Sequence, residues 1–223
     1  MDGFEIGRAL NESLAAISGA ARRSLVQISS GQGMRQGAGA GMIWHKDGVI
    51  VTNAHVVGRG NVQVTLPDGE TVSARLIAAD PERDLAALHI DAHDLATARA
   101  ATAPALPGQW VTAVGHPWGV LGASTSGIVI GTGREFPDMM PMAKDWVIAS
   151  LRMRPGHSGG ALVDAEGHVV GINTMITGPT IGLAIPVSAV QTFLDQVIGG
   201  IALPPHTEAD GDLNVDEQFL DIL

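Results

Sequence analysis

The chain has 223 residues, of which 45% are apolar and 16% are charged. This is typical of a globular domain that buries a core without the help of disulfides or metal ions. Its net charge of −10 and its aromatic content of 4% argue against a nucleic-acid partner. Cysteine is absent, which excludes disulfides, thiolate catalysis and cysteine-ligated zinc. Because no window reaches 18 apolar residues, we expect no membrane span.

The first segment, residues 1–20, is predicted to be an amphipathic helix. Ile6, Leu10, Leu14 and Ile17 recur three to four residues apart, as on one helical face. No basic stretch followed by an apolar run precedes them, so a signal peptide is not expected. The chain would be cytoplasmic if Met1 is its native start, and extracytoplasmic otherwise.

Residues 21–202 carry about a dozen short apolar runs separated by glycine, proline and aspartate. The runs span residues 25–28, 41–44, 49–52, 62–66, 72–77, 85–90, 110–114, 127–130, 146–151, 161–163, 169–172 and 182–185. This spacing, together with 29 glycines, predicts an all-β sandwich or a pair of barrels. An amphipathic helix with Val190, Phe193 and Leu194 on one face follows, and Gly199 ends it.

Residues 203–223 form an acidic C-terminal tail that is too short to fold alone. Carboxylates alternate there with apolar side chains such as Leu213 and Phe219. Two interpretations remain open for this segment: a solvated tail, or a segment that docks on a partner or on the chain itself.

The stretch Gly156-His157-Ser158-Gly159-Gly160 carries the strongest chemical signal. A serine hydroxyl attacks only when a base takes its proton and when donors face the developing oxyanion. Flanking glycines allow a backbone turn tight enough to direct two N–H groups to one point. Alone, this stretch is more typical of a glycine-serine hairpin.

Two further residues strengthen the catalytic interpretation of Ser158. His55 ends one apolar run and Asp84 precedes another, so the chain order is His, Asp, Ser. That order is the one found in the chymotrypsin-type arrangement, and it differs from the subtilisin and α/β-hydrolase orders.

The motifs around these residues resemble the HtrA/Deg branch of the chymotrypsin-like serine peptidases. The matching stretches are residues 37–41, 52–57, 84–88, 114–119, 156–162, 171–174 and 182–186. The resemblance implies two packed six-stranded antiparallel β-barrels, with a short N-terminal and a C-terminal helix. It also implies a serine endopeptidase without metal or cofactor that acts on unfolded or partly folded polypeptides in protein quality control.

The resemblance also assigns roles to single residues. Ser158 would be the nucleophile, His55 the base and Asp84 the group that orients it, while the backbone N–H groups of Gly156 and Ser158 would form the oxyanion hole. A homotrimer held by the N-terminal segment is expected as well. The family usually carries PDZ domains after the peptidase, and we expect none in this chain.

The residues before Ser158 depart from the family pattern. Arg152 occupies the position that forms the floor of the specificity pocket in chymotrypsin-like enzymes, which predicts a basic pocket for an acidic residue. The alternative is that Arg152 faces solvent and that Ile176, Thr177 and Ile181 line a pocket for small aliphatic residues.

Alternatives to the peptidase are a chaperone or binding module that kept the fold but rarely cuts, and an esterase with the same acyl chemistry. His89 and His93 are four residues apart but follow a strand-like run without a third ligand, so no metal site is expected.

Overall fold

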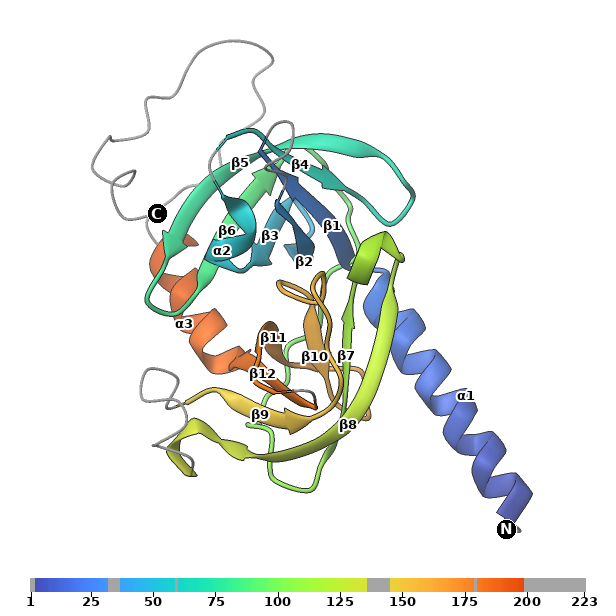
Figure 1. The fold of residues 1–223 in the computed structure, drawn as a ribbon. Helices are drawn as coiled ribbons and strands as arrows, with labels where there is room; N and C mark the ends of the chain where they lie inside the picture. Colours follow the sequence, from blue (N-terminus) through green and yellow to red (C-terminus); the bar gives the residue numbers. More distant parts are fainter. Residues whose placement is uncertain (1–2, 32–36, 59, 136–144, 179, 199–223) are drawn as a thin grey trace.

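The computed structural model contains two six-stranded β-barrels packed against each other (Figure 1). It describes residues 3–31, 37–58, 60–135, 145–178 and 180–198. The first barrel consists of β1 (Leu25–Ser30), β2 (Gly37–His45), β3 (Val49–Thr52), β4 (Val62–Thr65), β5 (Thr71–Asp80) and β6 (Leu85–Ile90). The second consists of β7 (Trp110–Gly115), β8 (Ala123–Thr132), β9 (Val147–Ser150), β10 (Ala161–Val163), β11 (Val169–Ile176) and β12 (Ile181–Pro186).

The two barrels share one topology. Their strand orders are β1-β2-β3-β6-β5-β4 and β10-β11-β12-β9-β8-β7. Antiparallel pairing closes each barrel, with Ile28 opposite Val64 in the first and Leu162 opposite Ala113 in the second. The predicted fold class is therefore confirmed. Strands β2, β5 and β8 are longer than predicted, because they continue through glycine and polar residues that an apolar run does not include.

The core is divided between the barrel interiors and the interface between the barrels. Strand β3 shows why, since all four of its residues are buried. Successive side chains on a strand point to opposite faces. Ile50 therefore packs inside the first barrel, while Val49 and Val51 pack into a cluster that also contains Ile172 and Ile185 of the second barrel.

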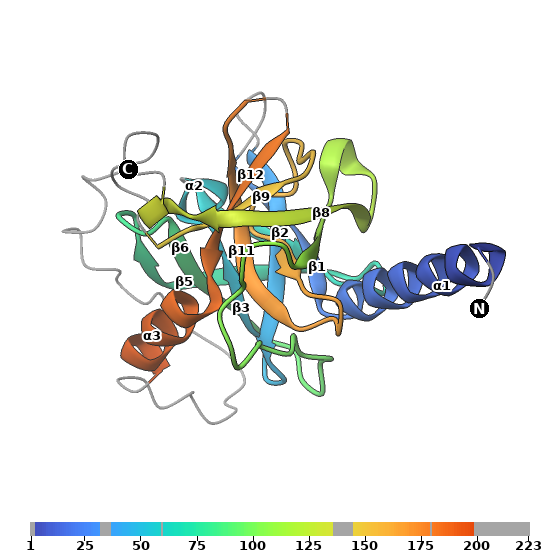
Figure 2. The ribbon, with the colours of Figure 1, turned by 90° about the horizontal axis from the view of Figure 1, so that it is seen from below.

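Three α-helices complete the described chain. Helix α1 (Gly3–Arg22) extends away from the barrels (Figures 1 and 2). Only Ile17, Ser18 and Ala21, near its C-terminal end, are buried. Helix α3 (Val187–Ile198) packs Val190, Phe193 and Leu194 into the cluster between the barrels. Both confirm predicted helices. Helix α2 (Ala54–Val57) is a single turn that was expected as the end of a strand. The predicted tail, residues 203–223, lies outside the described residues.

Candidate active site

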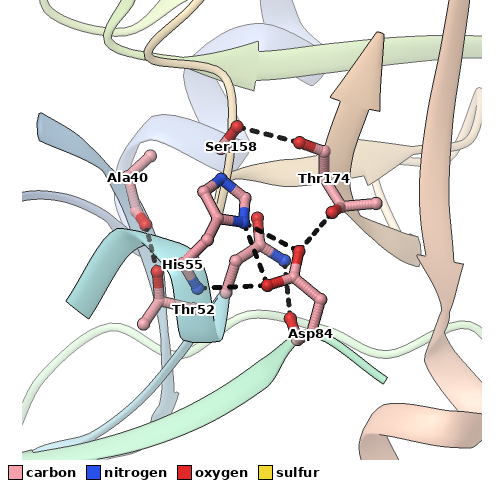
Figure 3. A network of polar contacts seen from close by, with 7 residues as sticks. Ala40, Thr52, His55, Asp84, Ser158 and Thr174 are labelled. Carbon is pink, nitrogen blue, oxygen red and sulfur yellow. Dashed lines mark hydrogen bonds and ion pairs between the residues drawn. The ribbon is translucent and has the colours of Figure 1, made fainter. Parts of the chain in front are cut away.

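His55, Asp84 and Ser158 meet where the two barrels face each other (Figure 3). His55 lies on α2 directly after β3, Asp84 in the turn before β6, and Ser158 in the loop before β10. The Ala40 amide on β2 donates to the Ser158 carbonyl at 2.8 Å, which ties this loop to the first barrel. The group therefore forms only when the barrels pack together.

The Asp84 carboxylate holds His55 through both of its oxygens. His55 Nδ1 lies 2.8 Å from Oδ2 and 2.9 Å from Oδ1, and the His55 backbone N–H donates to Oδ1 at 3.1 Å. The Asp84 backbone has a φ of 57°, in the left-handed region that a non-glycine residue rarely adopts. The buried Asn53 side chain stabilises it by donating to the Asp84 carbonyl at 3.0 Å. Such a strained backbone commonly marks a functional position.

The pKa of the Asp84 carboxyl is lowered from its ordinary value. Burial opposes ionisation of this group, but hydrogen bonds from His55 and Thr174 and the charge of His55 outweigh burial. These donors favour the charged form. The carboxylate therefore stays ionised, as a group that orients an imidazole and stabilises an imidazolium must.

Thr174 on β11 is a site residue to which the sequence assigned no role. Its Oγ1 donates to Asp84 Oδ2, and its backbone carbonyl accepts a 2.9 Å hydrogen bond from Ser158 Oγ (Figure 3). Thr174 thus contacts two of the three predicted residues through different atoms. Its place in a stretch that matches the family was the signal available in the sequence.

The predicted oxyanion-hole residues, Gly156 and Ser158, lie on one closely packed loop. Gly156 has a φ of 102°, and a Cβ there would lie 2.5 Å from the His116 carbonyl oxygen. Among the residues that the structure describes, no acceptor pairs with the backbone N–H groups of Gly156 or Ser158. The loop is fixed by other bonds, from the His116 N–H to the Gly156 carbonyl at 2.8 Å and from the Gly159 N–H to the Asn173 carbonyl at 2.8 Å.

Two buried histidines, His116 and His157, lie in or next to the loop that carries Ser158. His116 Nδ1 accepts from the Gly122 N–H at 3.1 Å, and His157 Nδ1 lies 3.1 Å from the Arg154 N–H. Within the described chain, neither Nε2 has a hydrogen-bond partner. Burial lowers the pKa of His116 to about 4 and also lowers the pKa of His157. Both imidazoles are therefore neutral at pH 7.

The predicted pocket residues lie on two segments of the chain and differ in exposure. The Arg152 side chain is exposed. The neighbouring Leu151 and Met153 are buried instead and pack against Gly182, where a Cβ would lie 2.8 Å from a terminal carbon of each. Ile176 is exposed, whereas Thr177 and Ile181 are half-buried and linked by a 3.1 Å backbone hydrogen bond.

One group of side chains in the described residues brings three potential metal ligands together. Asp164, Glu166 and His168 place one ligand atom each within 4.8 Å of one another on the turn between β10 and β11. Asp164 Oδ1 already accepts the backbone N–H groups of Glu166 and His168, at 3.0 and 2.8 Å. The turn itself thus explains the cluster. Within the described residues, the helices lack the length and apolarity that a membrane crossing requires.

The known proteins that resemble this chain are peptidases. The trypsin-like peptidase domain model matches residues 39–172. Protease Do-like 1, chloroplastic, of Arabidopsis thaliana is 36% identical over 73% of this chain and 40% of its own length. A probable periplasmic serine endoprotease DegP-like of a Marinomonas species is 38% identical over 74% of this chain and 36% of its own length.

The solved structures include a serine endoprotease from Yersinia pestis that superposes with a TM-score of 0.73 and 29% identity, covering 82% of this chain and 67% of that one. The chain spans well under half the length of the curated relatives above. These similarities confirm the predicted resemblance to the HtrA/Deg branch. Since the domain model covers more than half of its residues, the chain belongs to the trypsin-like peptidase family.

Proposed function

We propose that the chain is a serine endopeptidase in which Ser158 is the nucleophile, His55 the general base and Asp84 the group that orients His55. The observation that carries the proposal is the double contact of His55 Nδ1 with the Asp84 carboxylate, at 2.8 and 2.9 Å. That contact keeps the proton on Nδ1 and leaves the Nε2 lone pair available as a base. In Figure 3 this second ring nitrogen lies on the Ser158 side of the imidazole.

In the proposed reaction, Ser158 Oγ bonds to the scissile carbonyl carbon while its proton moves to His55 Nε2. The carbonyl electrons move to the oxygen, where the N–H groups of Gly156 and Ser158 stabilise the negative charge. The C–N bond then breaks as His55 gives its proton to the leaving amine. Water then attacks the acyl carbon while His55 takes its proton. The ester bond to Ser158 breaks, and His55 returns the proton to Ser158 Oγ.

A second candidate function is a binding or chaperone module on the same fold. The Ser158 hydroxyl donates to the Thr174 carbonyl at 2.9 Å, so it must rotate toward His55 before it can react. If this resting state dominates, the chain binds unfolded polypeptides without cutting them.

A fluorophosphonate probe combined with casein digestion separates the two functions. The peptidase predicts labelling and casein fragments from the wild type and from Ser188→Ala, which replaces an exposed serine at the start of α3. Ser158→Ala should lose both signals. Absence of labelling in the wild type, with suppressed aggregation of an unfolded protein, would instead support the binding module. Comparing a reduced, carboxymethylated protein with its native form tests the proposed preference for unfolded substrates.

For the specificity pocket we propose that small aliphatic residues precede the cut. Arg152 is exposed, while Leu151 and Met153 occupy the space beside Gly182 and leave little depth for a large side chain. Ile176, Thr177 and Ile181 would form the apolar wall. A peptide panel varied at this one position should show cleavage after Val or Ala, and efficient cleavage after Glu or Asp would favour the basic pocket.

We also propose that α1 assembles the chain into a homotrimer. Ile17 and Ala21 on this helix are buried against the barrels, whereas Leu10, Ile6 and Phe4 are 50, 54 and 91% exposed. Exposed apolar residues on a helix that leaves the body favour a partner. Light scattering coupled to size exclusion should give three times the monomer mass. Leu10→Glu with Ile6→Glu should give a monomer, and Arg8→Glu on the same helix is the control.

A further inference from the structure

We propose that Trp118, Val120 and Leu121 form a binding surface for the residues that follow the scissile bond, with preference for a large apolar side chain there. We call these three residues the Trp118 surface. The inference rests on the proposed endopeptidase function and adds a specificity-determining site to it.

The Trp118 surface is exposed to a degree that the fold does not require. Trp118, Val120 and Leu121 are 74, 56 and 65% exposed and lie within four consecutive residues. Single exposed apolar residues are common, but a contiguous group that includes a tryptophan favours a binding role. Tryptophan is also suited to peptide binding, because it offers a large contact area with little side-chain entropy to lose.

The backbone under this surface is strained and held in place. Trp118 has a φ of 53°, and in the described residues only Asp84 and Asp94 share this left-handed conformation among non-glycines. The turn is closed by hydrogen bonds from the Gly119 N–H to the His116 carbonyl at 3.1 Å and from the Val120 N–H to the Pro117 carbonyl at 2.9 Å. A bulky residue kept in a strained turn, with its side chain in solvent, contributes little to stability and points to function.

The turn lies directly against the proposed oxyanion hole. The His116 N–H donates to the Gly156 carbonyl at 2.8 Å, and a Cβ on Gly156 would lie 2.7 Å from Pro117 Cα. On its other flank the Ser158 loop contacts β11, through Ser158 Oγ to the Thr174 carbonyl and the Gly159 N–H to the Asn173 carbonyl. The loop therefore lies between β11 and the turn.

This arrangement places the two parts of the substrate on opposite sides of the Ser158 loop. The residue before the cut is assigned to the side of Ile176, Thr177 and Ile181, on β11, β12 and the hairpin between them. A peptide that passes over Ser158 from that side continues toward the turn. The chain on the leaving-group side therefore meets Trp118.

Arg154 prepares the aromatic ring for binding. Its guanidinium lies 5.6 Å from the centre of the Trp118 ring, within cation–π range. The Arg154 backbone is fixed in turn, because its N–H lies 3.1 Å from His157 Nδ1. A ring held in this way loses less freedom when a substrate binds, which favours affinity.

The test compares two substrates that share the same residues before the cut. One is a peptide that continues for four residues with Leu or Phe among them, and the other is a p-nitroanilide that ends at the scissile bond. In Trp118→Ala, kcat/KM for the extended peptide should fall by about tenfold, the loss expected for an apolar contact of this size. The p-nitroanilide should change by less than about twofold, since it does not reach the Trp118 surface. Trp110→Ala, on β7, is the matched control and should change neither rate.

An equal fall for both substrates would overturn the proposal, since Trp118 would then act through the oxyanion loop. An unchanged rate for both would overturn it as well. Replacing the Leu or Phe of the extended peptide by Ser should reproduce the loss in the wild type and have little further effect in Trp118→Ala. A wild type that cleaves neither substrate would instead count against the proposed peptidase function.

Discussion

The Ser158 hydroxyl donates to the backbone carbonyl of Thr174, at 2.9 Å, while the Thr174 hydroxyl donates to Asp84. One residue of β11 therefore contacts the proposed nucleophile of the second barrel and the carboxylate of the first. Because the backbone carbonyl cannot move without β11, any residue at this position retains the contact with Ser158. The contact with Asp84, in contrast, depends on the side chain, so the two roles can be separated by substitution.

Thr174→Val should lower kcat by about tenfold with a small change in KM. It removes a hydrogen bond to a charged group, and such bonds contribute about 1.5–3 kcal/mol. The loss should also move the pKa of Asp84 upward, since the Thr174 donor helps to lower it. Thr174→Ser keeps the hydroxyl and should retain most of the activity. Steady-state kinetics with a fluorogenic peptide test this, and equal losses in both variants would contradict the role of the hydroxyl.

Asp84→Asn should lower kcat by about 10⁴-fold at neutral pH, because an amide that accepts at one atom and donates at another no longer selects the required tautomer of His55. Asp94→Asn is a matched control: Asp94 is exposed and shares the left-handed backbone, with a φ of 55° against 57° for Asp84. It should keep full activity. A similar loss in both variants would contradict the specific role of the Asp84 carboxylate.

Gly156→Ala should lower kcat by at least about 10²-fold, the usual cost of losing one oxyanion donor. A methyl group at this position would lie 2.5 Å from the His116 carbonyl oxygen, so the loop must shift. Gly108→Ala separates this clash from backbone strain, because Gly108 has a φ of 86° with no atom within 4 Å of a new Cβ. It should cost about 1 kcal/mol of stability and leave kcat unchanged. Thermal unfolding and kcat measured together distinguish the two effects.

The sequence predicted those features that depend on patterns along the chain. The apolar runs predicted the strands, and the order of His55, Asp84 and Ser158 predicted which side chains meet. It did not predict the hydroxyl contact of Thr174, because a threonine within an apolar strand carries no local sign of what it faces across the barrels. Nor did it determine whether Arg152 or Met153 turns inward, since that depends on the path of a loop.

The last prediction concerns acid stability and the buried His116. Burial lowers its pKa to about 4, with the neighbouring His157 contributing in the same direction, whereas an unfolded chain has a histidine pKa of about 6.5. Between pH 4 and 6.5, therefore, this histidine binds a proton in the unfolded state but not in the folded state. The resulting stability is present above pH 6.5 and is lost as the pH falls toward 4.

His116→Asn removes this titration and should make the melting temperature fall less steeply between pH 6.5 and 4 than in the wild type. Protonation would also break the 3.1 Å bond from the Gly122 N–H to His116 Nδ1, which braces the turn beside Gly156. Ser188→Ala is the control, because Ser188 is exposed and does not titrate, so this change should leave the slope unchanged. Calorimetry at half-unit pH steps provides the measurement. Parallel curves for the wild type and His116→Asn would show that His116 is not buried in its neutral form.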